Sequence, residues 1–139
     1  MEGQKKKILI IDDDSFLLDM YALKFSQNNF EVYTEGSGVQ AIEKIKGGLS
    51  PDVMLIDIIM PEMDGFEMLE KINTEKLSPN SVKIILSNKS QQADIDRGNS
   101  LGVAGYIIKA NSTPVEVISQ VINILSKKSS VPAGLKATN

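Results

Sequence analysis

Five short apolar runs, separated by segments with helical spacing, constrain the fold of this chain more than any other feature of its sequence. The runs span residues 8–11, 30–34, 53–56, 82–86 and 106–108. All but the second are almost continuously apolar, as in strands that are covered on both faces of a parallel sheet. Strand and helix alternate five times at a spacing that fits right-handed crossovers. The pattern therefore predicts an α/β fold built on one parallel sheet.

The segments between these runs carry helical patterns and helix-boundary signals. Spacing of the type i, i+3, i+4, i+7 predicts two helical core faces, formed by Leu18, Tyr21, Ala22 and Phe25, and by Ile118, Val121, Ile122 and Leu125. Gly47-Gly48 is expected to end the second helix, and Thr113-Pro114 with Glu116 to begin the last one. Residues 91–102 are polar, so a helix there is expected to be short or loosely held.

Composition limits the chemistry that this chain can perform. Its 139 residues suit one domain, and its net charge of −3 provides no general basic field for nucleic acid. The chain contains no His and no Cys. This excludes a Ser-His-Asp triad, a thiol nucleophile, a His or Cys metal site and a disulfide. Chemistry is left to carboxylates, hydroxyls, amines, the backbone and a bound hard cation.

The two ends of the chain show no targeting signal. Residues 1–7 are polar, and the apolar run that follows stops at Ile11, which is too short for a signal-peptide core or a membrane span. We therefore expect a soluble, cytoplasmic protein without membrane contact. Residues 129–139 mix Ser, Pro, Gly, Lys and Thr and are expected to form a flexible C-terminal tail. Residues 5–128 would then form the only domain.

Polar and charged side chains follow four of the predicted strands. They are Asp12 and Asp13 after the first, Asp57 after the third, Ser87 after the fourth and Lys109 after the fifth. The carboxyl ends of parallel strands share one edge of a sheet, where ligands bind. Clustered carboxylates need a counter-charge, and Mg²⁺ prefers oxygen ligands. The spacing therefore suggests Mg²⁺-dependent phosphoryl transfer to an aspartate, with a hydroxyl and an amine contacting the phosphoryl oxygens.

Some of these acids have a simpler structural explanation when each is taken alone. Asp14 suits a helix N-cap, and Asp12 and Asp13 suit the start of a helix, where acids complement the helix dipole. Asp57 is harder to explain in this way, because an unpaired charge at the mouth of a buried strand is costly.

The same residues lie in motifs that resemble the receiver domain of bacterial two-component response regulators. In chain order the motifs are the run 8–11 with Asp12-Asp13, Asp57 with Met60-Pro61-Glu62-Met63-Asp64-Gly65, Ile85-Leu86-Ser87, and Gly105-Tyr106-Ile107-Ile108-Lys109. The resemblance covers about residues 5–128. It implies a flavodoxin-like, doubly wound sheet of five parallel strands in the order 2-1-3-4-5, with helices on both faces.

The resemblance also implies a phosphoacceptor and a magnesium site. Asp57 would accept the phosphoryl group. Asp12 and Asp13 would hold Mg²⁺ together with Asp57, directly or through water, and the backbone carbonyl of Ile59 would be a further ligand.

A switch is implied at the neighbouring strand ends. Lys109 would pair with the phosphoryl oxygens, Ser87 would follow the phosphoryl group, and Tyr106 would swing inward behind it. The alternative for Tyr106 is an ordinary, partly buried strand aromatic. The domain would catalyse only its own phosphorylation and dephosphorylation, with a sensor histidine kinase or a phosphotransfer protein as its donor.

The implied function is that of a stand-alone response regulator. It would signal through phosphorylation-dependent contact with another protein, as a monomer or weak dimer and without binding nucleic acid. One alternative is a degenerate receiver that acts as a constitutive binding module. Another is an aspartate-nucleophile phosphatase in which Asp12-Asp13-Asp14 supplies the nucleophile, although this leaves the loop at residues 60–65 unexplained.

Two positions depart from the family's pattern. The family usually has a cis proline after the lysine, whereas this chain has Ala110. A cis non-proline bond costs about 2.5–4 kcal/mol, so either that cost is carried or Lys109 is presented differently.

The residue after Ser87 is usually small, whereas here it is Asn88. Asn88 and Ile59 would flank the phosphoryl group and obstruct an attacking water, which predicts slow self-dephosphorylation and a shorter phosphoryl lifetime in Asn88→Ala.

Overall fold

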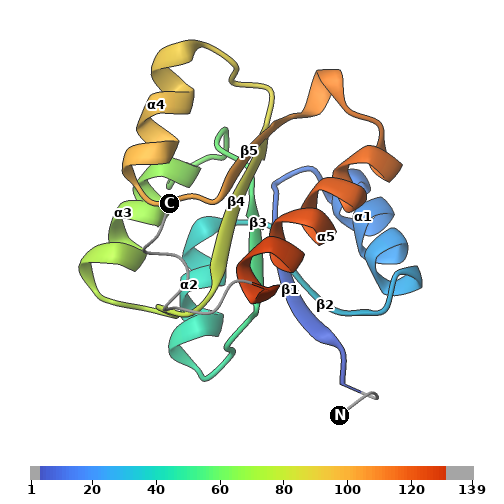
Figure 1. The fold of residues 1–139 in the computed structure, drawn as a ribbon. Coiled ribbons are helices and arrows are strands. Elements are labelled where there is room, and N and C mark those ends of the chain that lie inside the picture. Colours follow the sequence, from blue (N-terminus) through green and yellow to red (C-terminus); the bar gives the residue numbers. More distant parts are fainter. Residues whose placement is uncertain (1–3, 131–139) are drawn as a thin grey trace.

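The computed structural model describes residues 4–130, with side chains as far as residue 127. Strands and helices alternate along the chain in the order β1 (Lys6–Ile11), α1 (Ser15–Gln27), β2 (Phe30–Glu35), α2 (Gly38–Lys46), β3 (Val53–Ile56), α3 (Gly65–Thr74), β4 (Val82–Ser87), α4 (Gln92–Ser100), β5 (Gly105–Ile108), the short 3₁₀ turn η1 (Lys109–Asn111) and α5 (Pro114–Ser130). All strands pair in parallel, in the order β2-β1-β3-β4-β5. The predicted doubly wound α/β fold, including the 2-1-3-4-5 order that the resemblance implied, is confirmed (Figure 1).

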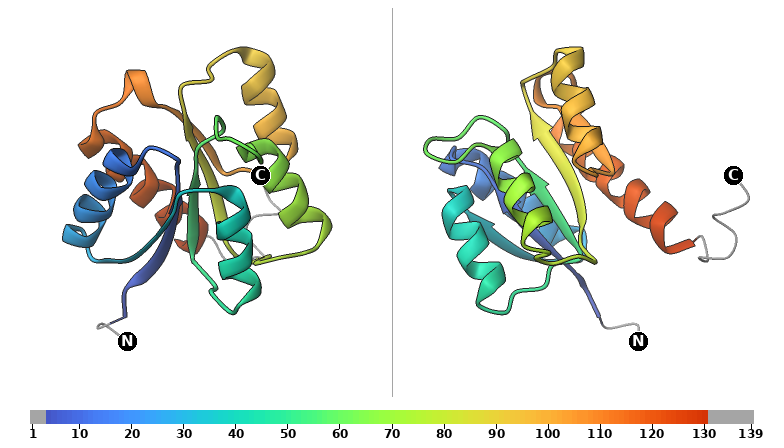
Figure 2. Two further views of the ribbon diagram at one scale, coloured as in Figure 1. Left: turned by 180° about the vertical axis from the view of Figure 1, so that it is seen from behind. Right: turned by 90° about the vertical axis from the view of Figure 1, so that its left-hand side faces the viewer.

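The sheet separates two hydrophobic cores. Successive residues of a strand point to opposite faces, so each central strand contributes to both cores. Ile8 and Ile10 pack with α1 and α5, whereas Leu9 and Ile11 pack with α2 and α3. Figures 1 and 2 show α1 and α5 on one face and α2, α3 and α4 on the other. Burial on both faces is the physical reason for the nearly continuous apolar runs.

The predicted helix boundaries are confirmed by their capping contacts. The Asp14 carboxylate accepts hydrogen bonds from two backbone N–H groups in the first turn of α1, at 3.0 and 3.2 Å. Thr113 and Glu116 form the predicted reciprocal capping pair at the start of α5. Helix α2 ends at Lys46, with Gly47 as its C-cap residue. These three helices therefore begin or end where a local side-chain or glycine signal lies.

The predicted core face of α5 is wrong at one position. Ile118 and Val121 are buried as expected, but Ile122 is 41% exposed and Val117 is buried. The apolar stripe of α5 is wider than the arc that contacts α1 and the sheet. Ile122 lies at the edge of that arc, so its side chain reaches solvent.

Helix α5 also extends beyond the expected domain boundary. It runs to Ser130, two residues past residue 128. The rest of the expected tail, residues 131–139, lies outside the described residues. Between residues 4 and 130, none of the helices combines the length and apolarity that crossing a membrane requires.

Helix α4 forms as predicted, and it is short. Gly98 is its one fully buried residue, so it offers little apolar surface to the core. Arg97 supplies contacts to α3 instead. Its guanidinium lies over the ring of Phe66, 4.5 Å from the ring centroid, and pairs with the Glu70 carboxylate at 3.0 Å. Polar and cation–π contacts therefore supplement the weak apolar packing of α4.

Candidate functional site

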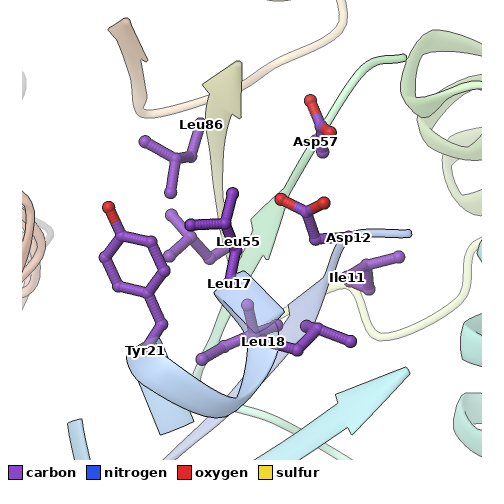
Figure 3. A pocket seen from close by; sticks show the side chains of 9 residues that line it. Ile11, Asp12, Leu17, Leu18, Tyr21, Leu55, Asp57 and Leu86 are labelled. Carbon is purple, nitrogen blue, oxygen red and sulfur yellow. The ribbon is translucent and has the colours of Figure 1, made fainter. Parts of the chain in front are cut away.

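Four strand ends place polar and charged side chains at one edge of the sheet. Asp12 directly follows β1, Asp57 follows β3, Ser87 ends β4, and Lys109 follows β5. Asp12, Asp57 and Ser87 are buried. Figure 3 shows the carboxylates of Asp12 and Asp57 close to each other at the ends of their strands.

Three of the predicted residues form an acidic cluster, which we define as Asp12, Asp13 and Asp57. Each offers one carboxylate oxygen, and these oxygens lie within 4.8 Å of one another. Asp13 is exposed, whereas the other two are buried. The acidic cluster therefore extends from the interior to the surface through Asp13.

Lys109 joins the two buried acids. Its Nζ donates to an oxygen of Asp12 at 2.7 Å and to an oxygen of Asp57 at 3.2 Å, and its side chain is 15% exposed. No peptide bond in the described part of the chain is cis, so the bond between Lys109 and Ala110 is trans. The sequence left open whether the bond before Ala110 is cis or whether Lys109 is presented differently. The structure shows the second case, because Lys109 reaches the acids without a cis bond.

Burial and neighbouring charges shift the ionisation of this site. Burial raises the pKa of Asp57, and repulsion from Asp12 raises it further, while Lys109 and the hydroxyl of Ser87 act in the opposite direction. Burial alone would lower the pKa of Lys109, but its contacts with the two acids outweigh that effect and raise it. One ammonium group is thus hydrogen-bonded to two buried carboxylates. The excess negative charge and the hard oxygen donors fit a divalent cation such as Mg²⁺.

A mainly apolar pocket lies beneath the buried carboxylates (Figure 3). Its lining comes from β1, α1, β3 and β4 and consists of Ile10, Ile11, Asp12, Leu17, Leu18, Tyr21, Leu55, Asp57 and Leu86. Burial in this lining raises the pKa of the Tyr21 hydroxyl. These apolar side chains contribute to the burial that raises the pKa of Asp57.

The loop between β3 and α3 holds Asp57 from the other side. Asp57 Oδ1 accepts a hydrogen bond from the N–H of Ile58 at 2.8 Å, and the Ile58 carbonyl accepts one from Gly65 at 2.9 Å. A Cβ at Gly65 would overlap the carbonyl oxygen of Asp57 and lie 2.9 Å from Ile58 Cα. Glycine therefore permits the close approach. Sequence reasoning placed Gly65 in a motif but did not identify this contact, which depends on two segments meeting.

The predicted switch residues contact the loop after β4. The Tyr106 hydroxyl donates to the Lys89 carbonyl oxygen at 2.5 Å, and the backbone N–H of Lys89 donates to Ser87 Oγ at 3.3 Å. Burial raises the pKa of Tyr106. The side chain of Ile59, whose carbonyl is the expected metal ligand, is 57% exposed. A switching role for Ser87 and Tyr106 stays a prediction.

One contact beside the site was not predicted from the sequence. Asn88 Oδ1 accepts a hydrogen bond from the backbone N–H of Ala110 at 2.8 Å. Both residues depart from the family's pattern, but each was considered alone. The available signal was chemical: alanine keeps the N–H that proline lacks, and asparagine can accept it.

Comparisons with known proteins agree with this geometry. Residues 8–122 match the family model described as the response regulator receiver domain. Response regulator SaeR of Staphylococcus aureus (strain USA300) is 30% identical over 120 residues, which cover 86% of this chain and 50% of SaeR. The chain spans about half the length of the curated relatives it matches.

Solved structures show the same fold. A CheY-like receiver domain protein from Methanospirillum hungatei JF-1 is 25% identical with a TM-score of 0.82, covering 91% of this chain and 98% of that one. The receiver domain of the Francisella response regulator 1452 is 25% identical with a TM-score of 0.79, covering 89% and 99% of the two chains. With a family model that matches most of its length, this chain belongs to the response regulator receiver domains of two-component signalling.

Proposed function

We propose that this chain is a phosphorylation-controlled receiver in which Asp57 accepts a phosphoryl group in a Mg²⁺-dependent reaction. One observation carries the proposal. Asp57 is buried at a strand end inside an acidic cluster, with the Lys109 ammonium 3.2 Å away. A carboxylate held in this way is positioned as a nucleophile beside a cation that can compensate for added negative charge.

The transfer step follows from the chemistry of these side chains. An oxygen of Asp57 forms a bond to phosphorus, the bond between phosphorus and the donor atom breaks, and its electron pair leaves with the donor. The product is an acyl phosphate. Lys109 pairs with one phosphoryl oxygen, and the Ser87 hydroxyl donates a hydrogen bond to another. Asp57, Ser87 and Lys109 are thus the proposed catalytic residues.

The proposed Mg²⁺ ligands are the side chains of Asp12, Asp13 and Asp57, with the backbone carbonyl of Ile59 as a further ligand. Carboxylate and carbonyl oxygens are the donors that Mg²⁺ prefers, and the acidic cluster supplies three carboxylates. When bound, the cation neutralises charge on the transferring phosphoryl group.

The proposed donor is a sensor histidine kinase or a phosphotransfer protein. This chain contains no His, so a phosphohistidine donor has to come from a partner. We propose that the signal passes on through protein contact, as the Ser87 and Tyr106 region responds to phosphorylation. The net charge of −3 argues against direct contact between this domain and nucleic acid.

Intact-mass measurement after incubation with acetyl phosphate and Mg²⁺ tests the proposal. We expect one phosphoryl group on the parent and none on Asp57→Asn, because the amide is not a nucleophile towards phosphorus. Asp19→Asn is a matched control, since Asp19 is exposed on α1 outside the acidic cluster. Chelation with EDTA should abolish the gain in mass.

Two results would contradict this function. A folded parent that gains no mass from acetyl phosphate or from a phosphorylated histidine donor would indicate a constitutive binding module. Sustained turnover of a generic phosphomonoester such as p-nitrophenyl phosphate would indicate a phosphatase instead.

A further inference from the structure

A side-chain hydrogen bond continues the connection between β4 and β5 beyond the sheet. The register of these strands ends where Ser87 pairs with Ile108, so Asn88 and Lys109 are the next residues on each side. Asn88 Oδ1 then accepts the backbone N–H of Ala110 at 2.8 Å. The chain that leaves β5 is therefore tied to the end of β4 at the residue after Lys109.

The Ala110 N–H belongs to the same planar peptide unit as the Lys109 carbonyl. That carbonyl accepts a hydrogen bond from the N–H of Ser112 at 3.3 Å, which closes the short turn η1. Asn88 holds the N–H end of this plane, and Ser112 holds the carbonyl end. Because the plane cannot bend, the two contacts together fix the backbone direction at Lys109.

This direction decides where the long side chain of Lys109 can reach. Its Nζ contacts Asp12 at 2.7 Å and Asp57 at 3.2 Å, two residues that follow β1 and β3 and lie far away in the sequence. A flexible side chain reaches two fixed partners reproducibly when its backbone origin is fixed. We propose, resting on the function proposed above, that Asn88 is a positioning residue that orients Lys109 towards Asp57 through the peptide plane of Ala110.

Asn88 and Ala110 form a matched pair in this chain. A proline at position 110 would carry no N–H, so it would give the Asn88 oxygen nothing to accept. With alanine, the N–H remains and the peptide is trans. The asparagine then supplies the constraint that holds the loop in the orientation that presents Lys109.

The first measurement follows Lys109 without any phosphoryl transfer. Trace acetylation with sulfo-NHS-acetate in EDTA, read by peptide mass spectrometry, gives the labelling rate of Lys109 relative to the exposed Lys76. We expect Asn88→Ala to raise this ratio about fivefold, the effect of losing one hydrogen bond that biases the bound orientation. Asn88→Asp keeps the acceptor oxygen and should restore the parental ratio.

Asn111→Ala is the matched control. Asn111 lies on the same loop and is exposed, and among the described residues its side chain makes no hydrogen bond. Its labelling ratio should equal that of the parent.

The initial rate of phosphorylation by acetyl phosphate should fall about fivefold in Asn88→Ala and not in Asn111→Ala, since weaker placement of Lys109 slows transfer. Asn88→Leu replaces Asn88→Ala if far-UV circular dichroism shows that the latter is unfolded.

The outcomes separate this inference from the proposed function. If the parent gains a phosphoryl group but Asn88→Ala leaves Lys109 labelling unchanged, the positioning role is wrong and the proposed function stands. If Asn111→Ala raises labelling equally, general loosening of the loop explains the effect and the inference is also wrong. If Asn88→Ala alone exposes Lys109 but no protein takes up phosphate, the positioning contact is supported and the proposed function fails.

Discussion

Asp57 is a buried residue whose negative charge is only partly compensated. Burial and the neighbouring Asp12 both raise its pKa, and Lys109, which opposes them, is shared with Asp12. The ionised form of Asp57 therefore reduces the stability of the fold, while the same arrangement supports the proposed roles of this carboxylate as metal ligand and phosphoacceptor.

Asp57→Asn is expected to raise the free energy of unfolding by about 1 kcal/mol near neutral pH, because the amide is not repelled by Asp12. The raised pKa sets the pH dependence. The ionised Asp57 carboxylate lowers the free energy of unfolding of the parent. This loss of stability decreases as the pH falls through the folded-state pKa of Asp57, and it is absent below the ordinary aspartate pKa of 3.8. The amount by which Asp57→Asn exceeds the parent in free energy of unfolding should therefore decrease as the pH is lowered.

Urea titrations over this pH range measure the advantage, with Asp19→Asn as a control that should stay close to the parent. An advantage that stays constant or grows towards acid would show that the charge of Asp57 is not its source.

Gly65→Ala is expected to destabilise the protein by about 1–3 kcal/mol, the usual cost of overpacking. The added Cβ would overlap the Asp57 carbonyl oxygen, and backbone atoms there cannot rotate away. The same variant should slow phosphorylation by displacing Asp57. Gly36→Ala is the control, because its added Cβ would meet no atom within 4 Å. Urea unfolding of the two variants decides the point, and equal stabilities would contradict the close-approach explanation.

The residues of the site were predictable to different degrees. Asp12 and Asp57 were identifiable because each acid directly follows an apolar run, which is a local signal. The bond between Asn88 and Ala110 was not, because it joins residues 22 positions apart whose meeting depends on strand pairing.

Among the α-helices, α4 has the weakest apolar attachment. Gly98 is its one buried residue, and Arg97 links it to α3 through Phe66 and Glu70. The polar sequence of residues 91–102 predicted a short helix, and the structure confirms it. That sequence did not predict the contacts of Arg97, because its partners lie on a different helix.

Arg97→Ala is expected to lower the free energy of unfolding by about 1 kcal/mol, the sum of an exposed cation–π contact and a surface ion pair. Amide hydrogen exchange should increase mainly in α4, because the lost contacts attach that helix. Lys71→Ala is the control, since the ion pair of Lys71 is with Glu75, the C-cap residue of its own helix α3. Equal acceleration of exchange in all helices would contradict the local attachment.

The whole molecule brings together side chains that lie far apart in the sequence. The ion pair between Lys109 and Asp12 joins residues 97 positions apart, and that between Lys109 and Asp57 joins residues 52 positions apart. The parallel sheet does this by carrying four strand ends to one edge. A ligand bound at this edge stabilises the whole fold, because the site exists only when the strands are paired.

Mg²⁺ is therefore expected to raise the free energy of unfolding, by about 1.4 kcal/mol when its concentration is about ten times its dissociation constant. The physical reason is that a divalent cation neutralises the acidic cluster in the folded state. Urea unfolding with and without Mg²⁺ measures the effect, which should be much smaller in Asp12→Asn and retained in Asp19→Asn. Equal stabilisation of all three proteins would place the cation elsewhere.

The alternation of strands and helices, their caps and the acids at the strand ends were determined by the sequence itself. These features depend on residues close to one another in the chain, where periodicity and capping chemistry act. The strand order followed from the resemblance rather than from periodicity. Only the tertiary structure decided which arc of α5 is buried, how Lys109 reaches the acids with a trans peptide, and that Asn88 holds Ala110. Each of these depends on distances between segments that meet only after the sheet has formed.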